Sequence, residues 1–146
     1  MDSPYYWLIS INTTSVAVAL VQNSTPSLVS SIGPDTEWTP GDPDSFLRSV
    51  DISLSAAAEK VSMDPEDEPS QAAFILPPQW IGNDGKIFPD YLKLMENLCH
   101  SLKLKPLGFI SNDEAFIEAL GKLDSFPPSF ILLNLGQKEF TTSLVY

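Results

Sequence analysis

A short apolar run near the middle of the chain constrains the fold more than any other feature. Residues 72–78 read AAFILPP, and an unbroken run of this length predicts a strand that is covered on both faces. A second short strand is predicted at 106–110 (PLGFI), with an amphipathic helix between the two. Strands that are joined through single helices pair in parallel, because the chain has to cross back over the sheet. The sequence therefore predicts an α/β fold with a partly parallel sheet.

The helices are predicted from their starts and their periodicity. Asp42 is expected to cap a first helix that begins at Pro43, and a second helix is expected to begin at Pro89. Ser111 and Glu114 have the spacing of a capping box, which predicts the start of a third helix. Apolar residues at three- and four-residue spacing predict the buried sides of the three helices: Leu47, Val50, Leu54, Ala58 and Val61; Tyr91, Leu92, Met95, Leu98, Cys99 and Leu102; Phe116, Ile117 and Leu120.

Strand patterns stand at both ends of the chain. Residues 6–12 and 15–22 predict a hairpin, and residues 27–32 predict a weaker third strand. Residues 33–43 are rich in proline and glycine and are predicted to form a loop. Residues 130–146 (FILLNLGQKEFTTSLVY) predict a second hairpin at the end of the chain. Antiparallel strands at the ends and parallel strands in the middle together predict a mixed sheet.

The predicted core combines apolar residues of these strands and helices. Its members alternate along the strands or share one side of a helix. They are Ile9, Ile11, Val16, Val18, Leu54, Phe74, Leu76, Leu98, Ile110, Leu120, Ile131 and Leu133.

The composition limits the partners that the chain can have. The chain has 146 residues, of which 43% are hydrophobic, so it can bury a core as one domain. The 19 acidic and 8 basic residues give a net charge of -11, which argues against nucleic acid and anionic membranes as partners. We predict a cytoplasmic protein without direct membrane insertion, since the sequence shows no secretion signal and no apolar run of the ~20 residues that a span needs. The single cysteine, Cys99, suits a reducing compartment.

The sequence motifs predict no catalytic or metal site. Cys99 and His100 are neighbours on a predicted helix, where they point about 100° apart and cannot jointly bind a metal ion. Cys99 is therefore predicted to be an inert thiol of the apolar side. The acidic stretch 64–69 (DPEDEP) is a possible cation site, but its carboxylates are expected to be solvated. The tryptophans are scattered in the sequence and are predicted to serve packing: Trp7, Trp38 and Trp80.

The order of the elements resembles a known fold. The segments AAFILPPQWI, KLKPLGFISNDEAFIEALGKLDS and FILLNLGQKEFTTSLVY are similar in order and spacing to the first lobe of the actin-like ATPase superfamily. That superfamily includes DnaK-type chaperones, sugar kinases, and the actin-like proteins of cell division and pilus assembly. The N-terminal ISINTTSVAVAL looks like its first phosphate hairpin. The resemblance implies a ribonuclease H-like α/β fold: a mixed five-stranded sheet of three antiparallel and then parallel strands, with helices on both faces, followed by a second hairpin.

The resemblance also implies where a nucleotide site would lie. In the superfamily the turns of the two hairpins lie side by side, their backbone N–H groups cradle the phosphates, and two aspartates hold magnesium through water. In this chain Ser10 and Asn134 stand where those aspartates belong, and Asn12 stands where a glycine belongs. The positions that match the two vestigial phosphate loops are Ser10, Asn12, Thr13, Thr14, Asn134, Gly136, Gln137 and Lys138.

With these departures, the resemblance implies a degenerate ATPase-fold domain. The expected function is a pseudo-ATPase scaffold that binds a protein partner without hydrolysing ATP, and no catalytic residue, metal or cofactor is expected. The alternative is the N-terminal lobe of a nucleotide-binding, chaperone-like or kinase-like ATPase that needs its second lobe. ATP and magnesium are expected only in that alternative.

The resemblance further implies that residues 1–146 form a single domain, the first lobe of a longer protein. The expected partner is another protein or the remaining domain of the same protein. A lobe without its neighbour exposes strand edges, and exposed edges pair with one another. Self-association through the strand at 139–146 is therefore predicted.

Overall fold

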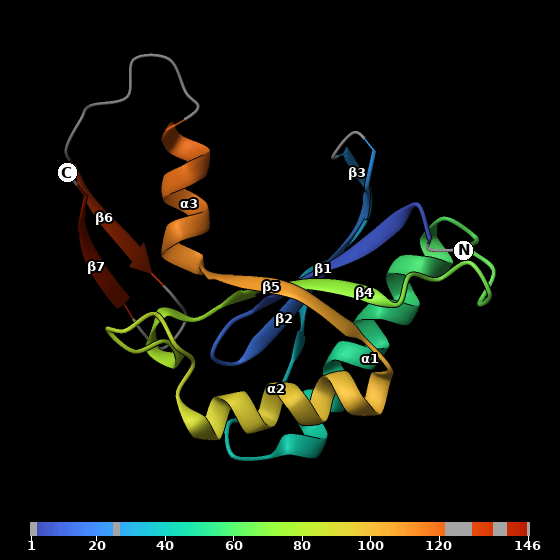
Figure 1. The fold of residues 1–146 in the computed structure, drawn as a ribbon, viewed down its shortest axis with the longest axis horizontal. Helices are drawn as coiled ribbons and strands as arrows, with labels where there is room; N and C mark the ends of the chain where they lie inside the picture. Colours follow the sequence, from blue (N-terminus) through green and yellow to red (C-terminus); the bar gives the residue numbers. More distant parts are fainter. Residues whose placement is uncertain (1–2, 25–26, 122–129, 136–139, 146) are drawn as a thin grey trace.

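The protein is described by a computed structural model that covers residues 3–24, 27–121, 130–135 and 140–145. The predicted order of strands and helices is confirmed (Figure 1). The elements are β1 (Tyr5–Ile11), β2 (Ser15–Gln22), β3 (Ser27–Glu37), α1 (Pro43–Lys60), β4 (Gln71–Leu76), the 3-10 turn η1 (Pro78–Trp80), α2 (Pro89–Leu102), β5 (Lys105–Ser111), α3 (Asn112–Gly121), β6 (Phe130–Leu135) and β7 (Phe140–Val145).

The main sheet has five strands in the order β3-β2-β1-β4-β5. β2 is antiparallel to both of its neighbours, β3 and β1, whereas β4 runs parallel to β1 and β5 runs parallel to β4. β6 and β7 form a separate antiparallel hairpin. The central strand β1 thus joins the antiparallel half of the sheet to the parallel half, as the sequence predicts.

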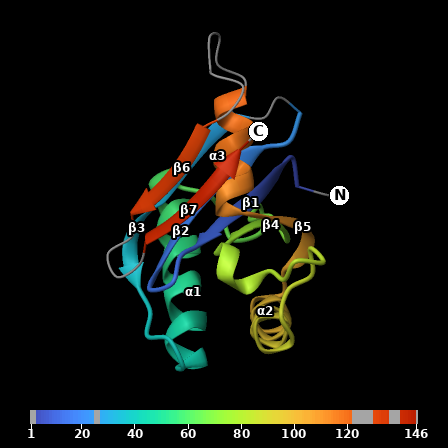
Figure 2. The ribbon, with the colours of Figure 1, turned by 90° about the vertical axis from the view of Figure 1, so that its left-hand side faces the viewer.

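The helices cover both sides of the sheet. α1 and α2 lie on one side and α3 lies on the other (Figures 1 and 2). α1 packs on β2 and β3, while α3 contacts the parallel strands β4 and β5. The ribonuclease H-like arrangement that the resemblance implies is therefore confirmed.

The core lies between the sheet and the pair α1 and α2. Side chains along β1 and β4 alternate between buried and half-buried, and the buried set faces the two helices. Eight predicted core residues are buried: Ile9, Ile11, Val16, Val18, Leu54, Phe74, Leu76 and Leu98. The burial of Leu120, Ile131 and Leu133 lies outside the described part of the chain. Among the described residues, Trp7 and Phe46 are the largest side chains that are almost completely buried, and the predicted core list contains neither of them.

The start of α1 shows how its sequence fixes the element. The side chain of Asp42 accepts hydrogen bonds from the backbone N–H groups of Asp44 and Ser45, and Pro43 occupies the first helical position. These contacts satisfy N–H groups that a helix start leaves without partners. The predicted cap is therefore confirmed.

Serine hydroxyls tie α1 to the edge strand β3. Ser30 donates to the carbonyl of Ala57 at 2.9 Å, and Ser53 lies 2.8 Å from the hydroxyl of Thr36. Ser53 is fully buried and also donates to the carbonyl of Ser49. Because hydrogen bonds are directional, these contacts define how α1 lies along the strand.

The prediction of a loop over residues 33–43 is wrong in its first part. β3 continues through Gly33 and Pro34 as far as Glu37. β3 is an edge strand, where a proline is tolerated because its missing N–H faces no partner strand. The pairing of β3 with β2 shifts between Val16 and Val18, whose partners are Thr36 and Ile32, so Gly33 and Pro34 lie at an irregularity of the ladder.

Some predicted buried positions are exposed. Leu92 and Val61 are 42% and 38% exposed, because Leu92 lies on the side of α2 away from the core and Val61 follows the end of α1. Ile110 is half-buried, since it belongs to the edge strand β5. Ala73 and Ile75 of β4 are also only half-buried, so the predicted full coverage of both faces of that strand is wrong.

We predict that Gly33→Ala lowers the free energy of unfolding by about 2 kcal/mol. Gly33 has a φ of +125°, and a Cβ atom there would lie 2.6 Å from both the Cα and Cβ atoms of Ala17. Gly41 is the matched control, since its φ is +86° but nothing lies within 4 Å of the corresponding position. Urea unfolding of both variants checks the prediction, and equal losses would contradict the steric part of it.

Candidate functional site

The turn between β1 and β2 holds the first of the two predicted phosphate loops. Its first residue, Asn12, donates its backbone N–H to the carbonyl of Ser15 at 2.8 Å. The side-chain amide of Asn12 also donates to the hydroxyl of Ser15 at 3.3 Å. Asparagine suits such a position because its side chain bonds to nearby groups of the turn. The turn is therefore closed by bonds within the hairpin.

Trp38, which directly follows β3, donates two hydrogen bonds to this turn. The indole N–H of Trp38 donates to the carbonyl of Asn12 at 3.0 Å, and its backbone N–H donates to the carbonyl of Thr14 at 2.9 Å. Trp38 is 8% exposed. Two carbonyls of the turn thus have partners on one residue of the core.

Trp38 belongs to an aromatic cluster that connects the segment after β3 with α1, η1 and α2. Its ring centroid lies 4.9 Å from that of Phe46 on α1 and 6.2 Å from that of Trp80 in η1. Trp80 in turn stacks on Tyr91 of α2 at 4.5 Å. The prediction that the tryptophans serve packing is confirmed, although two of them are neighbours in space and not scattered.

A second contact reaches the turn from the far end of the sheet. The side-chain amide of Asn112, the first residue of α3, donates to Oδ1 of Asn12 at 3.2 Å. The predicted capping box positions this residue: Ser111 Oγ accepts from the N–H of Glu114, and the Glu114 carboxylate accepts from the N–H of Ser111. The β5–α3 junction and the first hairpin therefore meet at one pair of asparagines.

The other predicted site residues are placed as follows. Ser10 is a half-buried residue of β1, paired with Ala17 on one side and Ile75 on the other. Thr13 and Thr14 lie in the first turn, and both are half-buried. Asn134 lies in β6 opposite Thr141. Gly136, Gln137 and Lys138 lie outside the described residues.

The chemistry of these residues does not fit a magnesium ion. Magnesium sites in proteins normally include one or two carboxylates, whereas Ser10 and Asn134 carry neutral oxygen atoms. Within the part of the chain that the structure describes, no three His, Cys, Asp or Glu side chains gather as a metal site. The first turn instead offers neutral hydroxyl and amide groups.

Cys99 and His100 lie on α2, away from this turn. Cys99 is half-buried and packs against the core, while His100 is exposed. Burial raises the pKa of the Cys99 thiol above its ordinary value, because an apolar environment disfavours the thiolate. This environment matches the predicted inert thiol.

Sequence reasoning missed two residues of the site, Trp38 and Asn112. The signal for Asn112 was present, since the capping box at Ser111 and Glu114 marks the helix start at the end of a strand. No local pattern identifies Trp38, because its bonds to Asn12 and Thr14 link residues more than twenty positions apart.

The fold is similar to that of several solved structures. A ROK hexokinase from Thermus thermophilus matches with a TM-score of 0.59 and 10% identity, over 97% of this chain and 45% of that one. A ROK family glucokinase from Streptomyces griseus, solved in complex with glucose and AMPPNP, matches with a TM-score of 0.55 and 13% identity, over 97% and 44%. The Ppx/GppA phosphatase of Aquifex aeolicus matches with a TM-score of 0.50 and 9% identity, over 96% and 47%. No protein-family model and no curated protein matches the sequence.

These matches define the class of the fold. The kinases and the phosphatase are members of the actin-like ATPase fold, so the predicted resemblance is confirmed at the level of fold. The chain shares the fold of these proteins over nearly its whole length and spans less than half the length of each of the three chains. Among the described residues, none of the helices combines the length and the apolar character needed to cross a membrane.

We predict a coupling free energy of about 1 kcal/mol between Asn12 and Asn112, because their side-chain hydrogen bond joins two otherwise separate elements. A double-mutant cycle with Asn12→Ala and Asn112→Ala, measured by urea unfolding, gives this value. The control pair is Asn12→Ala with Asn97→Ala, since Asn97 is exposed on α2 and should add without coupling. Additive effects of Asn12 and Asn112 would show that the contact contributes nothing.

We also predict slow alkylation of Cys99 by iodoacetamide at pH 8 in the folded chain, compared with the chain unfolded in urea. The raised pKa of the thiol keeps it neutral where the unfolded chain begins to ionise. The neutral thiol therefore contributes to stability below the unfolded pKa of about 8.5, and this contribution is lost as the pH rises above it. Unfolding curves at several pH values, with Cys99→Ser as the control, check the sign. Faster alkylation in the folded chain would contradict the prediction.

Proposed function

We propose that this chain is a degenerate actin-like ATPase-fold domain that binds another protein and does not hydrolyse ATP. The observation that carries this proposal is the way the first turn is bonded. The backbone N–H and C=O of Asn12, and both ends of its side-chain amide, have partners within the protein, on Ser15, Trp38 and Asn112. A phosphate cradle needs backbone N–H groups that point at the ligand. At Asn12 that group is committed to Ser15.

The side chain of Asn12 also argues against a close approach of phosphate. Glycine serves in such turns because the backbone can come near the ligand without a side chain between them. Here the side chain of Asn12 lies between the turn and Asn112 and accepts a hydrogen bond from the Asn112 amide. An asparagine that is bonded on both sides cannot swing away without losing both hydrogen bonds.

The charges of the site support the same proposal. The resemblance places aspartates at positions 10 and 134, and this chain has serine and asparagine there. Magnesium bound to a nucleotide would meet neutral groups at both positions, and neutral oxygens do not compensate for the water that the ion gives up. A protein-binding role of the kind found in the cell-division and pilus-assembly relatives needs neither the metal nor the phosphates. A single cysteine suits a cytoplasmic location for such a scaffold.

A second candidate is a nucleotide-dependent, chaperone-like or kinase-like function in which a second lobe completes the site. The observation that favours it is the fold match to the glucokinase that was solved with AMPPNP, which extends over 97% of this chain but only 44% of that one. Thr13 and Thr14 would then stand next to the phosphates, and ATP with magnesium would be the cofactor. The two candidates differ in whether this chain contributes affinity for nucleotide.

We predict that ATP with magnesium binds this chain with a dissociation constant in the millimolar range or above, which corresponds to about 4 kcal/mol or less of affinity. The Ser10→Asp/Asn134→Asp variant should not restore binding, because the bonds of Asn12 remain in place. Isothermal titration calorimetry of both proteins measures this.

Asn12→Gly in the wild type and in the double variant is the informative control, because it removes the side chain that occupies the turn. Binding that appears only when all three positions are changed would support a degenerate site. Micromolar, magnesium-dependent binding of ATP to the unmodified chain would overturn the proposal and favour the second candidate.

A further inference from the structure

Four large apolar side chains are exposed on β5 and in the first part of α2 with its N-cap. They are Phe88, Leu92, Leu107 and Phe109, with exposed fractions of 47, 42, 52 and 40%; we call them the β5–α2 cluster. Single exposed apolar residues are ordinary on protein surfaces, whereas a group on two neighbouring elements is typical of a binding surface. None of the functions described above uses these residues.

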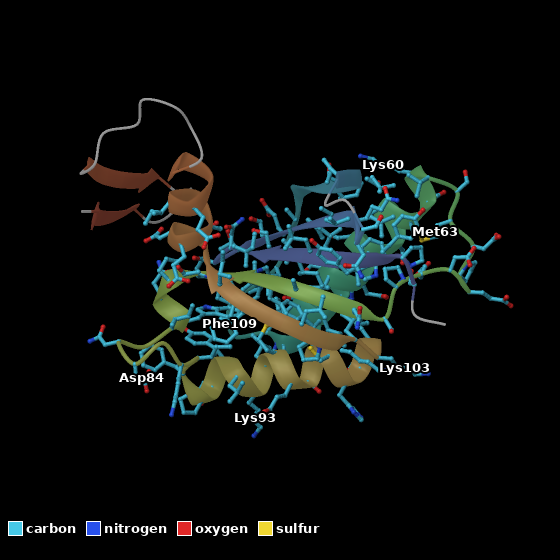
Figure 3. All side chains as sticks on the ribbon, turned by 45° about the horizontal axis from the view of Figure 1, so that its top comes forward. Lys60, Met63, Asp84, Lys93, Lys103 and Phe109 are labelled. Carbon is cyan, nitrogen blue, oxygen red and sulfur yellow. The ribbon has the colours of Figure 1, made fainter. Side chains whose placement is uncertain are left out.

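The two elements of the cluster run side by side. β5 is an edge strand of the sheet, and Figures 1 and 2 both show it alongside α2. Phe109 pairs with Phe74, whose buried side chain lies on the face that α1 and α2 cover. Figure 3 accordingly shows Phe109 between β5 and α2. Phe88 is the N-cap of α2, and its carbonyl accepts a hydrogen bond from the backbone N–H of Leu92 in the first turn of the helix. The cluster therefore spans a strand edge and the adjoining helix.

The segment that carries the cluster is basic, whereas the chain as a whole is acidic. Residues 86–109 contain four of the eight basic residues of the chain but only two of its nineteen acidic residues. All four lysines are exposed, and Figure 3 shows Lys93 and Lys103 at the surface of α2 and its C-terminal end. An apolar surface on a segment with exposed lysines is complementary to a partner that presents apolar and acidic side chains together. The lysines are Lys86, Lys93, Lys103 and Lys105.

The backbone of β5 is poorly suited to pair with a further strand. Pro106 lacks an N–H group, and the pairing with β4 shifts where Gly108 adopts a φ of +152°. Proline, lysine and irregular pairing on an edge strand are features that prevent the addition of another strand. A partner would therefore contact the side chains of the cluster and not the backbone edge.

We propose that the β5–α2 cluster binds an acidic amphipathic helix of a partner protein. This inference rests on the proposed protein-binding function and names the surface that performs it. The apolar side of the partner helix packs on the two phenylalanines and two leucines, in the manner of helices that bind in apolar grooves. Aromatic side chains at the centre of such a contact supply most of the binding energy. The lysines contact the acidic side of the helix, which speeds association and makes it dependent on salt.

A designed helical peptide of about five turns, with leucines on one side and glutamates on the other, tests this proposal by fluorescence anisotropy with the full 146-residue chain. We expect saturable binding, and a loss of affinity of about tenfold or more in Leu107→Ser/Phe109→Ser. The matched control is Leu28→Ser/Val29→Ser on the opposite edge strand β3, where both residues are exposed. That variant should bind the peptide as the wild type does.

Charge reversal separates the two parts of the contact. Lys103→Glu/Lys105→Glu should weaken binding and reduce its salt dependence, whereas Arg48→Glu on α1 should change neither, since Arg48 is exposed on a different helix. Thermal unfolding of each variant verifies that it is folded. A matched peptide with lysines in place of the glutamates should not bind.

Three results would overturn the proposal. The first is no binding of the acidic peptide, or equal binding by the cluster variant and the wild type. The second is binding of anionic lipid vesicles, and not of the peptide, by the cluster. The third is a dimer in light scattering that Leu107→Ser/Phe109→Ser abolishes, because the occupant would then be a second copy of the chain. None of these three results depends on whether the chain binds ATP. A failed helix-binding proposal can therefore be distinguished from a failed pseudo-ATPase proposal, which the ATP titration tests.

Discussion

Trp38 is the residue on which the candidate site depends most. Its backbone N–H and its indole N–H bond to two carbonyls of the first turn, while its ring packs on Phe46 and Trp80. A buried tryptophan needs a partner for its N–H, and buried carbonyls need donors. One side chain meets both requirements here. The shape of the turn is therefore determined by the packing of α1 and η1 beneath it as well as by its own sequence.

Much of the fold could be predicted because its local signals agree with its global arrangement. The Asp42 cap, the start of α2 at Pro89 and the capping box at Ser111 all lie where their sequence patterns place them. The prediction failed where sheet position outweighs local preference. Gly33 and Pro34 are loop residues in most contexts, yet an edge strand accepts them. The prediction that Ile110 is buried was wrong for a similar reason, because β5 is an edge strand with a neighbouring strand on one side only.

The candidate site was less predictable than the fold. Position 12 could be found because it interrupts two apolar strands, and its neighbours Thr13 and Thr14 follow the pattern of a turn. Its partner Asn112 lies one hundred residues further along the chain, and only the topology of the sheet brings the two together. The β5–α2 cluster could not be predicted from the sequence either. Periodicity alone assigned Leu92 to the buried side of its helix, whereas this residue is exposed. Patterns of spacing cannot distinguish the flank of a helix that the sheet covers from the flank that it leaves open.

The position of β1 at the centre of the sheet has a consequence for synthesis on the ribosome. The partner of β1 on one side, β2, follows it directly in the chain, whereas Trp7 pairs with Ala72 on the other side. Because a nascent chain emerges from its N-terminus, the hairpin can form from local contacts long before β4 exists. Trp38 reaches the turn with the end of β3, and Asn112 reaches it only after β5 is complete. The first turn is thus among the earliest parts of the protein to be made and among the last to be fixed.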